Sequence, residues 1–477
     1  MAPKEKARGT EALLTLDFNN LTDDALGEGR GIGAGELSSL EGTLASAARD
    51  FDARRKKGLL PFADLPSDPD LPKACRRLAS SARRKYDDVV VLGIGGSALG
   101  ANAVLAALRP LNHNTLPEAR RGWPRLFVAD NIDPEGFAAI LDGLDLSRTL
   151  FNVISKSGTT AETMSQFMIV HELLGKALGP KAARDHILIT TDPEKGVLRR
   201  LAREQGFQSL PIPPGVGGRF SVLTAVGLAP LALAGVNIEE LLAGARQAQD
   251  DFAAAPPSNK ALLFAGLNFH MATRRNRPGL VMMPYADGLA RVADWFGQLW
   301  NESLGKALHL DGSPAGTGQT AIKAVGVTDQ HSQLQLYMEG PPDKTVCFLG
   351  VEGFRKRVPI PRAFVDQAEL AYLGGGELGG LLNFERLGTA MALAESGRPN
   401  LSLLCPRISS AGLGYLMQTL MVATVVSGTL YQVDPLDQPG VELGKRFTYG
   451  LMGRQGFGDM AERYRGGLRA NGRYIVR

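Results

Sequence analysis

The sequence predicts an α/β protein with two parallel sheets of the doubly wound type and helical extensions at its N- and C-termini. Short apolar runs rich in β-branched residues alternate with helical segments along most of the 477 residues. These runs are apolar at nearly every position, as expected of strands buried on both faces. Glycine, at 57 residues against a typical share of about 7%, gathers at the turns between the segments.

The first half of the chain shows the clearest alternation. We expect strands at Val89–Leu92, Leu126–Ala129, Phe151–Ile154, His186–Thr191 and Gln208–Pro211. Helices are expected at Ala98–Leu108, Ala161–Leu174, Leu198–Glu204 and Val222–Ala234. Such sheets bind ligands where loops diverge at the carboxyl ends of the strands, so we expect a site there.

The second half is richer in helix. Strands are expected at Leu280–Met283, Lys344–Leu349 and Leu401–Leu404, and helices at Lys260–Thr273, Leu289–Leu299, Leu381–Ser396 and Gly412–Gly428. Leu59–Pro72 carries four prolines and is interpreted as a linker. We therefore divide the chain into a helical lead-in and linker over 1–72, a smaller domain over 73–235, and a larger domain with C-terminal helices over 236–477.

Charge gives no reason to propose a nucleic acid or membrane partner. The chain has 53 basic and 49 acidic residues, a net charge of +4. Two apolar stretches, Val222–Val236 and Leu413–Val426, are interrupted by Pro230 and Gln418, and we interpret both as buried core helices.

Cysteine and histidine usage indicates a cytoplasmic protein without a metal site. Cys75, Cys347 and Cys405 lie far apart and form no CxxC pair, so we expect reduced, buried thiols. The six histidines do not have metal-ligand spacing. The N-terminus lacks the apolar core of a signal peptide.

The turn Ser155–Thr160 has the composition of a phosphate site. It contains four hydroxyls, Lys156 and Gly158, and it joins a strand to the start of a helix. Free backbone N–H groups and the helix dipole favour an anion at such a point. An ordinary capped turn is the alternative reading of this stretch taken alone.

Two glycine turns also enter helices. Gly93–Gly96 resembles a dinucleotide fingerprint in outline, but its spacing is GxGGS and not GxGxxG. Gly217 and Gly218 precede Arg219, which favours a positioned guanidinium.

Three further side chains have ordinary readings when each is taken alone. Glu302 reads as a surface residue at a helix end, His331 as a structural histidine, and Lys445 as an exposed helical lysine.

Six segments together resemble the glucose-6-phosphate isomerase (phosphoglucose isomerase) family, whose members have two sugar-isomerase domains. In family order they are LGIGGSALGA at Leu92–Ala101, SKSGTTAET at Ser155–Thr163, GGRFSVLTAVGL at Gly217–Leu228, QLWNESLGK at Gln298–Lys306, DQHSQLQL at Asp329–Leu336 and DQPGVELGK at Asp437–Lys445. The resemblance covers most of the chain and implies reversible conversion of glucose 6-phosphate to fructose 6-phosphate.

The resemblance also implies the roles of individual residues. Glu302 matches the base that carries a proton between two carbons through a cis-enediolate, and Arg219 matches the residue that faces the enediolate. His331 and Lys445 match the groups implicated in ring opening. The implied substrate-binding residues are Gly96, Ser97, Ser155, Lys156, Ser157, Thr160, Gly218, Gln298 and Gln438.

The resemblance implies no cofactor and no metal, and it implies a homodimer in which His331 comes from the neighbouring subunit. The chain departs from the commoner pattern at Asp329, where the family often has Gly, and at Pro439, where it often has Trp. It also has NESLGK where MESNGK is common.

Three alternatives remain beside this reading. A non-catalytic phosphosugar-binding regulator would need the phosphate turn but not Glu302, Arg219, His331 and Lys445 together. An isomerase that also accepts mannose 6-phosphate is not excluded by sequence. A nicotinamide-dependent dehydrogenase would rest on the Gly93–Gly96 turn alone.

Overall fold

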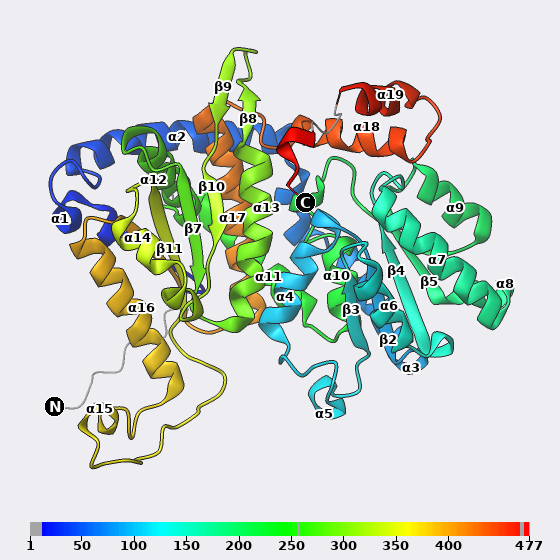
Figure 1. The fold of residues 1–477 in the computed structure, drawn as a ribbon, viewed down its shortest axis with the longest axis horizontal. Coiled ribbons are helices and arrows are strands. Elements are labelled where there is room, and N and C mark those ends of the chain that lie inside the picture. The colour runs from blue at the N-terminus through cyan, green and yellow to red at the C-terminus, as the bar shows by residue number, and fades with distance from the viewer. Residues whose placement is uncertain (1–11, 255–257, 468–471, 477) are drawn as a thin grey trace.

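The computed structural model describes residues 12–254, 258–467 and 472–476, and it contains two α/β units side by side (Figure 1). The sheet of the first unit has five parallel strands in the order β3-β2-β4-β5-β6. They are β2 (Asp88–Leu92), β3 (Arg125–Ala129), β4 (Thr149–Ile154), β5 (Ile187–Thr191) and β6 (Gln208–Pro211). Their order reverses between β2 and β4, which makes that point the topological switch of a doubly wound sheet.

Helices cover both faces of this first sheet. Val89 and Val91 of β2 pack on one face, against α3 (Asp70–Lys85), α4 (Leu99–Leu108) and α10 (Ala225–Leu233). Val90 and Leu92 point to the opposite face, against α6 (Pro134–Asp142), α7 (Ala161–Leu178) and α9 (Val197–Gln205). Alternate side chains of a strand point to opposite faces, so an entirely apolar strand fits between two helical layers. Two one-turn helices, α5 (Pro117–Arg120) and α8 (Pro180–Ala183), complete the unit.

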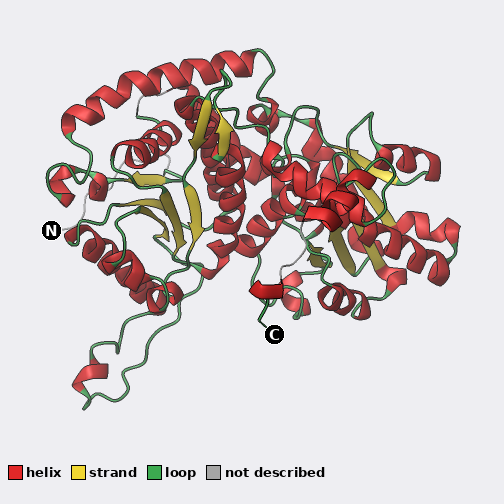
Figure 2. Ribbon diagram, turned by 45° about the horizontal axis from the view of Figure 1, so that its top comes forward, coloured by secondary structure: helices red, strands yellow, loops and turns green. Residues whose placement is uncertain are grey.

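The second sheet has the order β1-β12-β11-β7-β10. Its parallel strands are β7 (Gly279–Pro284), β10 (Thr320–Lys323), β11 (Lys344–Val351) and β12 (Asn400–Cys405). The edge strand β1 (Thr15–Asp17) runs antiparallel to β12. The predicted fold class is therefore confirmed, with one antiparallel edge that the sequence did not reveal. Figure 2 shows the two groups of strands, each between layers of helix.

Helix α17 (Ser410–Tyr431) is buried along nearly its whole length. It packs against α11 (Ile238–Ala254), α12 (Lys260–Arg274) and α13 (Ala290–Leu304). Helices α14 (Leu334–Glu339) and α16 (Leu378–Glu395) pack on the other face of the sheet, and α15 (Ala368–Ala371) lies in the long loop before α16 (Figure 1). Helix α17 is long and apolar enough to cross a membrane, but 89% of its most apolar window is buried inside the protein. We therefore assign it to the core, as the sequence predicted.

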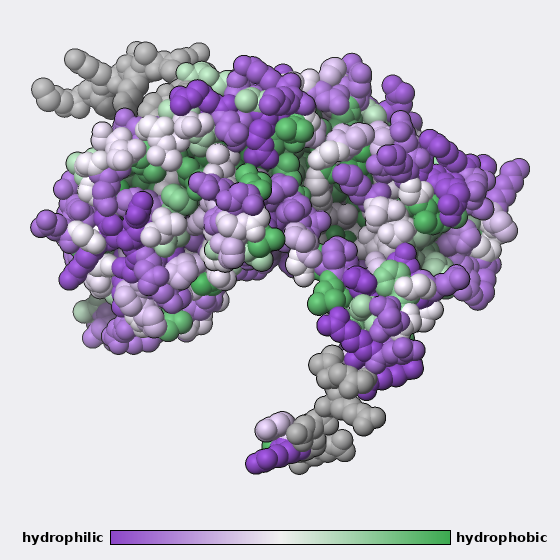
Figure 3. Space-filling model, turned by 90° about the horizontal axis from the view of Figure 1, so that it is seen from above, coloured by the Kyte–Doolittle hydropathy of each residue, from purple (hydrophilic) through white to green (hydrophobic). Residues whose placement is uncertain are grey.

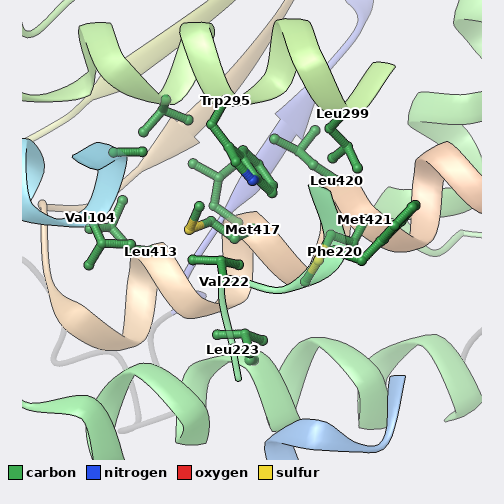
Figure 4. Close-up of a cluster of buried hydrophobic side chains, with 14 of the residues drawn as sticks. Val104, Phe220, Val222, Leu223, Trp295, Leu299, Leu413, Met417, Leu420 and Met421 are labelled. Atoms are coloured by element: carbon green, nitrogen blue, oxygen red, sulfur yellow. The ribbon is translucent and has the colours of Figure 1, made fainter. Parts of the chain in front are cut away.

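One hydrophobic core joins the two units. Leu413, Met417 and Leu420 of α17 lie beside Trp295 and Leu299 of α13 (Figure 4). Val104 of α4 and the segment Phe220–Leu223, both from the first unit, complete the same cluster (Figure 4). Polar side chains cover most of the outer face seen from above (Figure 3).

The structure corrects the expected organisation of residues 1–72. This segment contributes β1 to the second sheet, and α1 (Asp23–Leu26) and α2 (Ala34–Lys56) follow. The proline-rich stretch predicted to be a linker contributes buried side chains to the core: the Phe62 ring lies 4.8 Å from Phe220 and 6.3 Å from Phe51. Proline fixes the backbone without excluding burial, so this segment packs as core between the two units.

The C-terminal segment crosses back over the first unit. Helices α18 (Glu442–Leu451) and α19 (Gly458–Gly467) follow the second unit in sequence, yet they lie above the first unit in Figure 1. Lys445 of α18 lines the same cleft as loops of the first unit. The boundary expected at residue 236 therefore does not separate two independent bodies. A small hairpin, β8 (Lys306–Leu308) and β9 (Pro314–Thr317), was also not anticipated.

Helices α11 and α17 cross at glycines, and this crossing gives a stability prediction. A Cβ on Gly244 of α11 would lie 1.9 Å from the carbonyl oxygen of Ala411. We expect Gly244→Ala to lower stability by about 1–3 kcal/mol, because overpacking forces the helices apart. The measurement is the midpoint of thermal unfolding. Gly42→Ala on α2 is the matched control, because nothing lies within 4 Å of its added Cβ. It should be neutral or stabilising by up to about 1 kcal/mol, and an equal loss in both variants would contradict the packing argument.

Candidate active site

A polar cleft of about 690 Å³ lies at the switch point of the first sheet. The turns that follow β2 and β4 form one side of it, and the segment before α18 forms the other. Eight of the residues predicted to act here line this cleft: Gly96, Ser97, Lys156, Ser157, Thr160, Gly218, Gln438 and Lys445. The structure therefore brings together residues that are up to 349 positions apart in the chain (445 − 96).

The turn after β4 is held in shape by its own hydroxyls. Ser155 is only 2% exposed, and its Oγ accepts the Gly158 N–H at 3.0 Å and lies 3.0 Å from Thr160 Oγ1. The Thr191 hydroxyl donates to the Ser155 carbonyl at 2.7 Å. Ser155 thus lies behind the cleft and shapes the turn, while Ser157 and Thr160 face the cleft.

Gly158 and Lys156 connect this turn to its surroundings. Gly158 has φ +66°, and a Cβ there would lie 2.5 Å from the Leu198 nitrogen, so both conformation and space require glycine. Lys156 Nζ donates to the Val216 carbonyl at 2.8 Å. Its ammonium group is therefore held between the turn and the segment before Arg219.

The two glycine turns touch each other. Gly95–Ser97 forms the 3-10 turn η4, and Gly218–Phe220 forms η7. A Cβ on Gly96 would lie 2.2 Å from the Gly218 carbonyl carbon, and the Ser221 hydroxyl donates to the Gly96 carbonyl at 3.1 Å. This close approach fixes the position of Arg219 relative to the β2 turn.

Arg219 is buried and donates to five acceptors from two parts of the chain, the end of α13 and the loop before α18. Its Nε donates to Ser303 Oγ at 2.7 Å, and one terminal nitrogen donates to Gln438 Oε1 at 2.7 Å and to Glu302 Oε2 at 3.4 Å. The other donates to the carbonyls of Pro435 and Asp437, at 2.6 and 2.9 Å. Burial lowers the pKa of the guanidinium from its usual value, and Glu302 and Asp437 oppose that shift. An arginine so placed remains charged.

Glu302 has each carboxylate oxygen held by a different neighbour. Helix α13 continues to Leu304, five residues beyond the predicted end, so Gln298 and Glu302 lie one turn apart on one face. Gln298 Nε2 donates to Glu302 Oε1 at 3.2 Å, while Arg219 contacts Oε2. The side chain is 31% exposed, which leaves room for a ligand to reach it.

Sequence reasoning missed three residues that support this arrangement. Ser303 holds Arg219, as described above. Lys306 Nζ donates to the Glu302 carbonyl at 3.0 Å and to Asp437 Oδ1 at 2.8 Å. Ser303 and Lys306 lie in the motif that carries Glu302, and Asp437 precedes Gln438, so proximity to the motifs was the available signal.

The cleft is rich in ammonium groups. Lys156, Lys195 and Lys445 line it, and Lys195 was not anticipated. Asp192 is a carboxylate in the same lining, and backbone N–H groups of Glu194 and Lys195 donate to it at 2.9 Å. These hydrogen bonds, that of Glu194 first, hold the pKa of Asp192 below its usual value. Lys445 also donates to Glu442 Oε1 at 2.7 Å on α18.

Ser155, Arg219, Gln298 and Glu302 do not line the cleft themselves, but hydrogen bonds connect them to residues that do. Among the predicted residues, only His331 lacks such a connection within the described chain. It ends the 3-10 turn η9 (Thr328–His331), it is exposed, and it does not line the cleft. As for metals, no group of three or more His, Cys, Asp or Glu side chains suited to an ion occurs among the described residues.

An anion-binding turn and a buried arginine that contacts a partly exposed carboxylate lie where the two α/β units meet, an arrangement suited to an isomerase that acts on a phosphorylated sugar. The family model described as phosphoglucose isomerase matches residues 77–350 and 383–459. The chain belongs to the phosphoglucose isomerase family.

Individual relatives agree over nearly the whole length. A glucose-6-phosphate isomerase of Carboxydothermus hydrogenoformans is 46% identical, with 93% of this chain and 96% of the relative covered. One from Rubrobacter xylanophilus is 44% identical, with 93% and 99% covered. Among solved structures, a hypothetical protein of Thermus thermophilus superposes with a TM-score of 0.81 at 37% identity, covering 92% of this chain and 99% of that chain.

The environment of Arg219 gives a prediction on stability. Ser303→Ala removes the acceptor of the buried Arg219 Nε–H, which should cost about 1–3 kcal/mol because a buried donor is left unsatisfied. The measurement is the urea dependence of unfolding. Ser165→Ala on α7 is the matched control, since that hydroxyl is exposed and bonds only its own helix. It should change stability by less than about 0.5 kcal/mol, and a Ser303→Ala variant that behaves like this control would contradict the assigned contact.

Proposed function

We propose that this protein interconverts glucose 6-phosphate and fructose 6-phosphate, a step of glycolysis and gluconeogenesis, without a metal or a nicotinamide cofactor. The proposal rests on the hydrogen bonds that connect the cleft lining to the Glu302 carboxylate. Gln438 lines the cleft beside the phosphate-type turn, and one Arg219 nitrogen donates to both Gln438 and Glu302. The test is a coupled isomerase assay in chelator, with glucose and mannose 6-phosphates compared. Absence of turnover on both would overturn the proposal.

The turn after β4 holds the phosphate group in this proposal. Lys156, Ser157, Thr160 and Ser97 face the cleft and supply an ammonium group, hydroxyls and backbone N–H donors. Ser155 supports them from behind through Gly158 and Thr160. Binding energy from a remote phosphate positions the reacting carbons, which is why a non-reacting group accelerates the chemistry.

Glu302 carries the proton between C1 and C2 of the open-chain sugar. Removal of the C2 proton places negative charge on the enediolate oxygens, and Arg219, fixed by its five acceptors, faces that charge. Gln298 and Gln438 orient the carboxylate and the substrate. The hydroxyl proton moves from O2 to O1 of the enediolate, and the same carboxylate returns its proton to C1, which leaves a carbonyl at C2 and Glu302 ionised again.

The phosphate turn alone would serve a regulator that binds phosphosugars. The buried Arg219 beside the partly exposed Glu302 carboxylate favours the isomerase, because a regulator would not need a fixed guanidinium next to a base. A dehydrogenase is disfavoured because the Gly96 backbone packs against Gly218, where the dinucleotide fingerprint would place a pyrophosphate.

We also propose that the protein acts as a cytoplasmic homodimer in which His331 completes the partner's site. His331 is exposed and lies outside the cleft of its own chain, which supports a role at a neighbouring site. There it assists Lys445 in ring opening. Cys75, Cys347 and Cys405 are free and buried, as is usual in a reducing compartment.

Glu302→Gln should lower kcat by about 10²–10⁴, because the amide cannot accept the C2 proton while it keeps the size of the carboxylate. Affinity for a non-reacting sugar phosphate, measured by calorimetry, should change little. Near-normal turnover in this variant would show that the base is another residue.

Lys156→Ala should act on affinity instead. Loss of a charge-assisted hydrogen bond of about 1.5–3 kcal/mol raises KM by about 10–100-fold, and kcat should fall by a smaller factor because the remote phosphate also positions the reacting carbons. The matched control is Lys181→Ala on α8, outside the cleft lining. An unchanged KM in Lys156→Ala would count against the phosphate turn.

Subunit mixing tests the shared site. Glu302→Gln and His331→Ala homodimers should both be weakly active. After unfolding and refolding as an equal mixture, about a quarter of wild-type activity should return, since half the dimers are hybrids with one intact site. Ultracentrifugation of each variant checks that dimers form. Failure of mixed dimers to regain activity would place His331 in its own chain's site or outside catalysis.

A further inference from the structure

The turn that carries His331 is built to hold that residue still. It lies between β10 and α14 on the second unit, near α16 (Figure 1). Within the described chain, no hydrogen bond or ion pair fixes the imidazole itself. We propose that Gln330 and Asp329, neither of which touches the sugar, are positioning residues for His331. This inference rests on the proposed function and on the role given there to His331.

Gln330 ties the turn to the sheet and to α16. Its Oε1 accepts the Tyr285 hydroxyl at 2.8 Å, and its Nε2 donates to Glu385 Oε2 at 3.1 Å. Tyr285 directly follows β7 and is fully buried, and burial raises the pKa of Tyr285 to about 12. The phenol therefore stays a donor at neutral pH, and the carboxylate can only accept. The Gln330 amide oxygen therefore faces Tyr285, and its amide nitrogen faces Glu385.

Asp329 makes hydrogen bonds to residues on both sides of it in the turn. One carboxylate oxygen accepts the Val325 N–H at 2.6 Å, and the other accepts the Ser332 hydroxyl at 2.6 Å. Its own N–H donates to the Val325 carbonyl at 2.7 Å, and its carbonyl accepts the Gln333 N–H at 2.9 Å. Burial raises the pKa of this carboxyl, but hydrogen bonds from Ser332 and Val325 outweigh burial and bring the net pKa below its usual value. The side chain is thus ionised at neutral pH.

These restraints matter because one side of the turn is open. Gly326, Val327 and Thr328 line a largely apolar groove of about 700 Å³, and Glu385 lies in the same lining. A turn beside such a space has room to move. The Asp329 carboxylate restrains the backbone of the turn two positions before His331.

The test separates ring opening from binding. In Gln330→Ala and Asp329→Gly, exchange between the α and β anomers of glucose 6-phosphate, measured by NMR, should slow by about 10-fold or more, and kcat should fall in parallel. Affinity for an open-chain hexitol 6-phosphate, which cannot form a ring, should stay within about 2-fold, because the cleft is unchanged. A merely structural defect would weaken this affinity and lower the melting temperature as well.

Matched variants sharpen the result. Gln335→Ala, an exposed glutamine that bonds only Glu339 on its own helix, should leave both rates unchanged. Gln330→Glu places two carboxylates in contact and should slow anomer exchange. Adding Glu385→Gln should restore it, since an amide then again faces a carboxylate and Tyr285 keeps an acceptor.

The results of these experiments distinguish the positioning role of Gln330 and Asp329 from the proposed isomerase function. If His331→Ala slows anomer exchange but the Gln330 and Asp329 variants do not, the positioning inference is wrong and the isomerase proposal stands. If Gln330→Glu is not rescued by Glu385→Gln, the contact with α16 does not act through His331. If wild-type protein has no isomerase activity, the proposed function itself fails.

Discussion

The buried guanidinium of Arg219 is the interaction on which the site depends. A charge removed from water is stable only when nearly all of its donors have good acceptors, since an unpaired buried ion costs several kcal/mol. Arg219 meets this condition with one hydroxyl, two side-chain oxygens and two carbonyls. Those acceptors come from the end of α13 and from the loop before α18, so a single side chain holds the two units in register.

The arrangement divides the site into a buried part and an exposed part. Arg219, Ser303 and Lys306 are buried and fully engaged, and they hold Glu302 at the edge of solvent. Lys445 and His331 are exposed. Stabilising an enediolate requires fixed dipoles that do not reorganise, whereas ring opening requires groups that exchange protons with substrate hydroxyls. Lys445 lines the cleft of its own chain, whereas His331 does not.

Glycine makes this geometry possible at one point in particular. The Gly96 and Gly218 turns approach so closely that a Cβ on Gly96 would overlap the carbonyl group of Gly218. One turn ends β2 and the other leads into α10, and they meet because the strand order reverses between β2 and β4. Sheet topology, and not any local signal, therefore places the phosphate-type turn beside the β2 turn, against which Gly218, the neighbour of Arg219, packs.

By itself the sequence predicted the element types and the phosphate-type turn, because these depend on local patterns: apolar runs, glycines at turns, and hydroxyls before a helix. The candidate reactive side chains came from the resemblance to a family, since Glu302, His331 and Lys445 carry no local signal of their own. Only the tertiary structure showed that β1 joins the second sheet, that Phe62 is core, and that Lys445 returns to the first unit. It also extended α13 past Asn301 to bring Glu302 onto the face of Gln298, because Trp300 and Leu304 are buried there. Long-range packing decides such features, and a residue's neighbours in sequence do not report which distant side chains will cover it.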